Sequence, residues 1–379
     1  MADLAPPALR LQLYVGPAIP IPAPKEVLDA LDQVTIETGS GETQSGFELT
    51  FKVAKNSSLE TLFLLTGGAS IPILRVVIAV TVAGTTEVLM DGVMTHHEIS
   101  TDAAMPTLKV KGKDLTAVMD VIPLDGVPYP AMPPAARALI VLAKYAVLGC
   151  VPLVIPSLFE DVPIPVERIP RHQGTDYAYL KALADEVGYV FYIDPGPVPG
   201  MSKAYWGPEI RIGVPQPALN SGFDHAHDNV SSLSFSFDKE QKEMPFVYIQ
   251  EPFSKAPIPI PIPDINPLAP PLGLIPPLPV RLTPLDDTAK LNPIAAIMRG
   301  VGYATRHSDS VTGTGSLEVV RYGHVLKSRQ LVGVRGAGDP FNGLYYVTHV
   351  SHTIKRGSFT QSFALARNGL VSTLPVVPT

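Results

Sequence analysis

Histidines and carboxylates stand at two places in the chain in spacings that could bind a metal ion. His225 and His227 alternate, so on a strand both imidazoles would share one face, and Asp228 follows directly. His96-His97-Glu98 forms the second group. A zinc site needs a third ligand, but Asn220–Asp224 before the first group reads as a polar loop that fixes none. We therefore expect no metal and no cofactor.

Patterns typical of enzymes also lack the context that catalysis needs. Gly333–Gly338 is as glycine-rich as a phosphate loop, but a strand follows it where a helix N-terminus would be required. The carboxylate pairs Glu160-Asp161 and Asp286-Asp287 lie in loop-like segments without a partner to separate their pKa values. His349 and His352 are three residues apart on a strand and so face opposite sides. The sequence predicts that the protein is not an enzyme.

The composition favours a globular protein that is poor in charge. The chain has 379 residues, a length that predicts two to four domains. Apolar residues make up 46% and charged residues 17%, with a net charge of −6, so no basic surface for nucleic acid is expected. So little charge suits a protein that buries much of its surface in an assembly. The single Cys150 excludes a disulfide framework, and the N-terminus shows no signal peptide.

The first third of the chain is predicted to be all-β. Short runs of alternating or β-branched residues recur at a spacing of about ten residues, which is typical of a sandwich or a barrel. The predicted strands are Leu9–Val15, Val34–Glu37, Gly46–Val53, Ile73–Val82, Thr86–Ile99 and Met105–Val110.

The middle of the chain is predicted to mix helices and strands. Ala135–Ile155 is long and apolar enough to be considered as a membrane span, but charged residues, a glycine and a proline interrupt it. We expect a buried amphipathic helix over Pro134–Leu148, followed by a strand. A second helix, Thr175–Gly188, has a capping threonine and a terminating glycine, and leads into the strand Tyr189–Asp194.

A proline-rich segment interrupts the last third, at about residues 252–286. Proline at alternate positions of Pro257–Pro263 removes backbone donors, so we expect polyproline II there and no place inside a sheet. The segment could be a semi-rigid linker, or an arm that lies in a groove of a neighbouring molecule. Its isoleucines favour the arm and make Ile258, Ile260 and Ile262 candidate partner-binding residues. A helix over about Asn292–Thr305 is predicted to follow.

Three strands close the chain and carry its most specific pattern. After a glycine-rich strand, Leu344–Val350 and Phe359–Leu365 alternate or are β-branched. This order resembles the C-terminal barrel of the tail-hub proteins, the late control D and VgrG-type family. Two other segments resemble that family, the helix and strand around Asp176, Leu180, Leu183, Ala184, Gly188 and Phe191, and the pair Ser45–Phe51 with Gly92–Met94. The C-terminal signatures fall on Gly343, Tyr345, Val347, Val350, Ser351, His352, Phe363, Leu365, Arg367 and Asn368.

The resemblance implies a mainly β fold with a smaller α/β part. Two similar antiparallel β-barrel domains, 1–120 and 229–379, would flank a mixed α/β domain at 121–228. Three copies would form a homotrimeric, pseudo-hexameric ring that joins a hexameric tail tube to a trimeric spike, beside other baseplate proteins. Leu344 and Tyr346 would lie in the ring wall and are further candidate partner-binding residues. The chain stops where VgrG-type members continue into a fused spike, so a separate spike protein would be needed.

The resemblance also implies where the protein works. It would be assembled in the bacterial cytoplasm and then form part of the baseplate of a phage tail or injection particle. The main alternative is a secreted or surface β-sandwich that binds carbohydrate or a protein ligand. A metal-dependent hydrolase that uses His225 and His227 is the third possibility.

Overall fold

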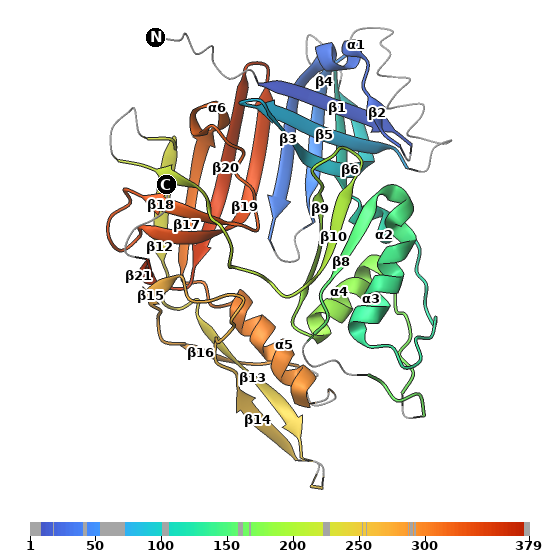
Figure 1. Cartoon of the computed structure of the whole chain (residues 1–379), viewed down its shortest axis with the longest axis vertical. Coiled ribbons are helices and arrows are strands. Elements are labelled where there is room, and N and C mark those ends of the chain that lie inside the picture. Colours follow the sequence, from blue (N-terminus) through green and yellow to red (C-terminus); the bar gives the residue numbers. More distant parts are fainter. Residues whose placement is uncertain are drawn as a thin grey trace.

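The computed structural model describes residues 9–374, except 18, 41–43, 54–72, 101–105, 158–161, 167, 223–227, 252, 255, 287, 289–290 and 292. The fold is mainly β. One sheet of 13 strands fills the upper part of Figure 1, and three smaller sheets lie below and beside it. None of the helices in the described ranges is both long and apolar enough to cross a membrane.

The first half of the large sheet confirms the predicted N-terminal strands. In β4 the buried positions Phe47, Leu49 and Phe51 alternate with less buried ones and point into the core, whereas β5 is buried along nearly its whole length. The strand order is β3-β4-β7-β6-β5-β1-β2. The elements are β1 (Arg10–Gly16), β2 (Ile21–Pro22), α1 (Lys25–Ala30), β3 (Leu31–Gly39), β4 (Gly46–Lys52), β5 (Arg75–Val82), β6 (Thr85–Ser100), β7 (Thr107–Asp114) and α2 (Thr116–Met119).

The second half of the sheet repeats the connectivity of the first. Five strands in the order β12-β17-β20-β19-β18 are antiparallel, as are β3-β4-β7-β6-β5. The sixth strands differ, because β1 runs antiparallel to β5 and β11 runs parallel to β18. The elements are β11 (Gln216–Asn220), β12 (Ser232–Phe237), β17 (Val311–Glu318), α6 (Val319–Tyr322), β18 (Leu331–Arg335), β19 (Gly343–Lys355) and β20 (Ser358–Arg367).

The two halves form one open sheet in the described residues, which corrects the prediction of two closed barrels. β3 pairs with β19 over seven register positions, from Gly39 opposite His349 to Gln33 opposite Lys355. One hydrophobic core runs across this joint and includes Ile36, Val350 and Phe359. The sequence showed the strands and their alternation, but this pairing joins residues more than 300 positions apart.

The α/β part packs two helices against a small sheet. Its strand order is β8-β10-β9, and its core contains the fully buried Trp206. Both predicted helices are present, and the Oγ1 of Thr175 accepts a hydrogen bond from the Ala178 backbone N–H at 3.2 Å as an N-cap. The elements are α3 (Pro134–Ala143), the 3-10 helix η2 (Lys144–Leu148), β8 (Cys150–Val154), α4 (Asp176–Glu186), β9 (Val190–Pro195) and β10 (Ser202–Gly207).

The proline-rich insertion forms strands of a second small sheet together with β13, where polyproline II was predicted. Its order is β14-β13-β16, and helix α5 packs on one face around Val247, Ile262 and Ala296. This sheet and α5 project at the lower end of the molecule in Figure 1. The elements are β13 (Glu243–Gln250), β14 (Pro257–Pro261), β16 (Arg281–Pro284), α5 (Pro293–Arg306) and the two-stranded sheet of β15 (Gly273–Ile275) and β21 (Leu370–Ser372).

Candidate assembly surfaces

Most of the C-terminal motif residues lie inside the protein. The side chain of Arg367 is fully buried, and its guanidinium donates to the Asn342 carbonyl at 2.9 Å and the Pro340 carbonyl at 2.7 Å. It also lies 4.5 Å above the ring of Tyr345. Burial lowers the pKa of Arg367 below its usual range. The motif that carried the resemblance therefore fixes the loop before β19.

Asn368 ties the insertion to the large sheet. Its Oδ1 accepts hydrogen bonds from the backbone N–H groups of Leu272 at 3.0 Å and Gly273 at 3.2 Å. β15 then pairs with β21 just beyond this residue. Gly273 and Gly369 approach so closely that a Cβ on Gly273 would lie 2.3 Å from the Gly369 carbonyl oxygen, so both positions need glycine.

The five predicted partner-binding residues differ in exposure. Ile262 and Tyr346 are buried at 3% exposure each, within the insertion core and beside Leu331. Ile260 and Leu344 are partly buried against the same clusters. Ile258 on β14 is 46% exposed. Partner binding stays a prediction for all five. Ile258 has the largest exposed fraction of them in this conformation.

The outer edge of β14 has no backbone donors. Ile258 and Ile260 stand opposite Ile249 and Val247, and the flanking bonds run from Ile262 N–H to the Pro245 carbonyl and from Glu251 N–H to the Ala256 carbonyl. The even-numbered residues therefore bond to β13, and the proline nitrogens at 257, 259 and 261 face outward. A strand cannot extend this sheet at such an edge.

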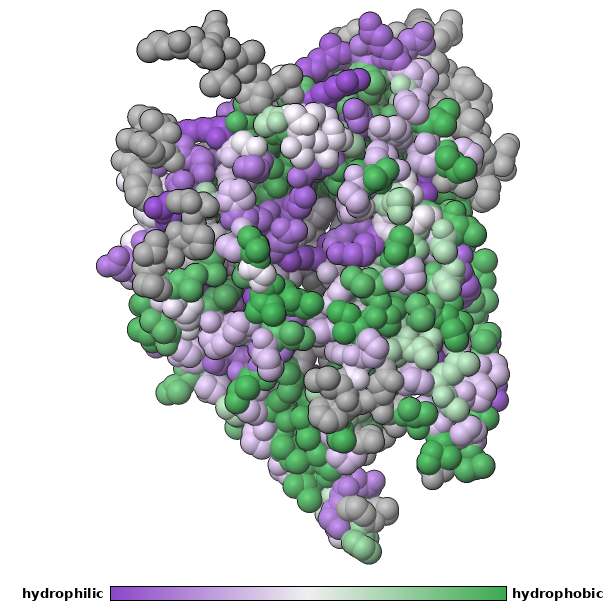
Figure 2. All heavy atoms as spheres, viewed as in Figure 1, coloured by the Kyte–Doolittle hydropathy of each residue, from purple (hydrophilic) through white to green (hydrophobic). Residues whose placement is uncertain are grey.

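Exposed apolar side chains gather over the α/β part and the insertion. The lower half of the molecule in Figure 2 is richer in hydrophobic residues than the top. Val147 after α3 is 86% exposed, and Val151 and Leu153 on β8 are 49% and 43% exposed. On the insertion, Leu278, Val280 and Leu282 are 84%, 62% and 68% exposed. Apolar surface of this extent is typical of a protein that binds others.

A polar surface crosses the joint between β3 and β19. The Nε2 of His349 lies 2.7 Å from Glu37 Oε2, and the Ser351 hydroxyl donates to Glu37 Oε1 at 2.7 Å. His352, on the opposite face, is 3% exposed, as its odd spacing from His349 predicted. Burial lowers the pKa of His352 to about 3, so it is a neutral core residue near neutral pH.

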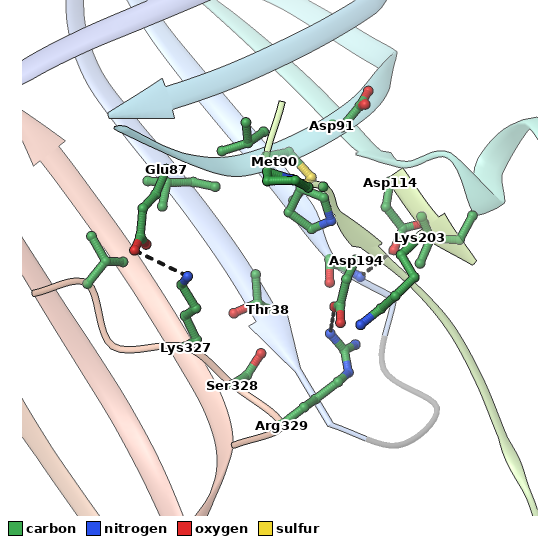
Figure 3. A pocket seen from close by; sticks show the side chains of 18 of the residues that line it. Thr38, Glu87, Met90, Asp91, Asp114, Asp194, Lys203, Lys327, Ser328 and Arg329 are labelled. Carbon is green, nitrogen blue, oxygen red and sulfur yellow. Dashed lines mark hydrogen bonds and ion pairs between the residues drawn. The ribbon is translucent and has the colours of Figure 1, made fainter. Parts of the chain in front are cut away.

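A cavity of about 420 Å³ lies where the large sheet meets β9 and β10 (Figure 3). Ion pairs cross it, from Arg329 to Asp194 at 2.6 Å and from Lys327 to Glu87 at 3.2 Å. Burial raises the pKa of Asp114 in its wall, although hydrogen bonds from Thr116 and Ser45 oppose the shift. The charges are mostly paired with each other, so the arrangement holds chain segments together.

The described part of the chain contains no cluster of side chains that would form either of the metal sites considered from the sequence. His225 and His227 lie outside the described residues, as does the pair Glu160-Asp161. His96 and Glu98 are exposed on β6, on one face of the strand. Among the described residues, no three histidine, cysteine or carboxylate side chains gather as metal ligands would.

Comparison with solved structures finds this fold in proteins of phage tails. A tail protein from Neisseria meningitidis has a TM-score of 0.62 at 13% identity, over 96% of this chain and 98% of that one. The 43 kDa tail protein of prophage MuSo2 from Shewanella oneidensis has a TM-score of 0.61 at 15% identity, over 95% and 99%. A type VI secretion component of E. coli, which itself resembles the T4 tail proteins gp27 and gp5, scores 0.52 at 10% identity, over 92% and 76%. No family model and no curated protein matches the sequence.

Sequence reasoning missed the strand edges as candidate sites. β12 ends the path of the large sheet, and it is uncharged and free of proline. Among the residues that the structure describes, the second half of β6, Thr95–Ser100, pairs with β7 on one side only. Edge status depends on the whole topology, so no local pattern could have identified either segment.

Proposed function

We propose that the protein is a structural component of a phage tail or a related injection system, and that it serves as the baseplate hub between tube and spike. The duplication of five antiparallel strands within one chain carries this proposal. Three copies with two similar units each would present six equivalent units to a hexameric tube. The same three copies would present three equivalent faces to a trimeric spike.

In this hub, residues 1–120, 121–228 and 229–379 would be the units of assembly. The first and third would build the ring, and the α/β unit and the insertion would contact other baseplate proteins through their exposed apolar side chains. A spike protein would bind one face of the ring. The work of the protein is attachment, and no reaction is assigned to it.

Deleting the gene tests the proposal in the host. We expect electron microscopy to show no complete tail or injection particles, and complementation with the intact gene to restore them. Quantitative mass spectrometry of purified particles should find three copies of the chain for the six subunits of one ring of the tube. Normal particles in the deletion strain would contradict the proposal, and a monomer with affinity for glycans would favour a binding module.

A further inference from the structure

The two halves of the large sheet can be superposed residue by residue from their pairing registers. Both contain a bulge in the same strand, between Met94 and His96 in β6 and between Val347 and His349 in β19. His96 therefore corresponds to His349. Following the registers across β7 and β4, and across β20 and β17, makes Phe235 of β12 correspond to Ile36 of β3.

Within the chain, β3 and β19 show how two such units join. β18 covers the first part of β19, up to Tyr346, and leaves one edge of His349–Lys355 for β3. The joint is antiparallel and places Ile36 opposite His352 and Glu37 opposite Ser351. It uses the free edge of one unit and the uncovered second half of the long strand of the other.

The corresponding positions at the far ends of the sheet are open as far as the structure describes the chain. β5 covers β6 up to Val93, so one edge of Thr95–Ser100 has no strand partner among the described residues. Within the described part of the chain, β12 pairs only with β17 and ends the sheet path. One chain therefore presents both halves of a second joint, and the two halves lie on different units.

We propose that β12 of one copy pairs antiparallel with Thr95–Ser100 of a second copy and repeats the β3–β19 joint. The equivalent register places Phe235 opposite Ile99, Ser236 opposite Glu98 and Asp238 opposite His96. This contact deepens the proposed function and rests on it, since it names the surface through which copies of a hub would meet. It is head-to-tail and closes into a ring when the rotation between copies allows.

The side chains at this register are complementary. Within the chain, the Ser351 hydroxyl donates to Glu37. Between copies, Ser236 takes the place of Glu37 and Glu98 takes the place of Ser351, so the same hydroxyl-to-carboxylate hydrogen bond forms with its partners exchanged. On the same face, His96 meets the carboxylate of Asp238. Ile99 is 42% exposed and Phe235 is half-buried, and they would pack on the other face.

The strands at the other sheet ends are poorly suited to strand addition. In the described ranges, the remaining edge strands contain proline or are only three residues long, and these are β2, β8, β9, β11, β14, β16, β15 and β21. Proline on an edge removes the donor that an incoming strand needs. β12 has the sequence Ser-Leu-Ser-Phe-Ser-Phe, with neither proline nor charge. β12 therefore lacks the features that hinder strand addition at the other edges, and it is the strand that the second joint requires to be open.

Cysteine pairs test the register in the purified full-length chain. Ser236→Cys with Glu98→Cys should form a disulfide between copies on mild oxidation, because directly opposite residues in an antiparallel pair lie within disulfide range. Denaturing electrophoresis without reductant should then show a ladder of covalent oligomers, and reductant should return it to monomer. The native Cys150 is buried and should not contribute.

Three controls match this pair. Glu37→Cys with Ser351→Cys occupies the corresponding positions within the chain and should form an internal disulfide without any covalent oligomer. Ser236→Cys with Ile99→Cys is one residue out of register and should give no ladder. Ser236→Cys alone should stay monomeric, and covalent dimers from it would show that β12 pairs with itself and would overturn the proposal.

The outcomes separate this inference from the proposed function. Monomer from the Ser236/Glu98 pair, with the internal Glu37/Ser351 pair fully oxidised, overturns the strand joint. If such a chain is still found in tail particles, the hub assignment survives without it. A clear ladder from a chain that is absent from particles would keep the joint and remove the hub.

Discussion

Arg367 shows how a single charged residue can organise a loop from inside the protein. Its guanidinium satisfies the carbonyls of Asn342 and Pro340 and stacks on Tyr345, with no exposed surface. Those carbonyls would be left buried without donors if the side chain were replaced by an apolar one. The next residue, Asn368, extends the same support to the insertion.

Arg367→Met should therefore destabilise the protein by about 3 kcal/mol, because two buried carbonyls lose their charged donor. Urea unfolding followed by circular dichroism measures the loss. Lys25→Met on the exposed side of α1 is the matched control and should change stability by less than about 0.5 kcal/mol. Equal effects of the two substitutions would show that Arg367 has no structural role.

The neutral imidazole of His352 makes stability depend on pH. Its pKa of about 3 in the folded chain lies below the value of about 6.5 in an unfolded one. Its contribution is therefore complete above pH 6.5 and is lost as the pH falls towards 3, by about 1.4 kcal/mol per pH unit. His352→Asn keeps an acceptor for Gln361 Nε2 and should flatten the fall in unfolding free energy between pH 6.5 and 4.5. An unchanged slope would contradict this assignment.

At the scale of single elements, sequence patterns predicted those helices and strands that are determined by interactions between residues near each other in the chain. Helix α4 was expected from its cap, its apolar face and its terminal glycine, and those features form it. The alternating prolines at 257–261 were misread as polyproline II. A strand at a sheet edge needs donors on one side only, and proline at every second position removes them from the other side. The sequence alone does not show which side of β14 carries the bonds, because that depends on its pairing with β13.

Proline on β14 should keep the insertion from associating with other sheets. Replacing Pro257, Pro259 and Pro261 with threonine restores outward N–H groups without changing the bonds to β13. We expect self-association that light scattering detects at concentrations where the unmodified chain is unaffected. Ile258→Pro is the opposite change, since it removes a bond to β13, and it should lower the melting temperature of the chain. Equal scattering from the triple variant and the unmodified chain would contradict this account of the edge.

At the scale of the whole molecule, a buried ion pair fastens the large sheet to the α/β part. Arg75 on β5 and Asp91 on β6 are 2.6 Å apart, and both are almost fully buried. Arg75 also donates to the Gly200 carbonyl, and Ser202 on β10 donates to Asp91. Two side chains of the sheet thus bind Gly200, just before β10, and Ser202, its first residue, and no sequence spacing indicates these contacts.

Asp91→Asn should destabilise the chain by about 3 to 5 kcal/mol, because it leaves the Arg75 charge buried without its counter-ion. The double variant Arg75→Met with Asp91→Leu should recover most of this loss, since it removes both charges together. Chemical unfolding of the single and double variants measures the difference. A double variant that is less stable than Asp91→Asn would contradict this account. It would show that the ion pair stabilises the protein by more than the cost of burying its two charges.

The pairing of β3 with β19 has a consequence for synthesis of the chain. The edge of β3 finds its partner only when residues 349–355 have left the ribosome, more than 300 residues later. At about 5 to 20 residues per second, that edge stays unpaired for roughly 15 to 60 seconds. Nascent chains on neighbouring ribosomes of one mRNA would then expose the same unpaired strand edge close to one another. Folding of this protein is therefore expected to depend on chaperones that reach the chain before translation ends.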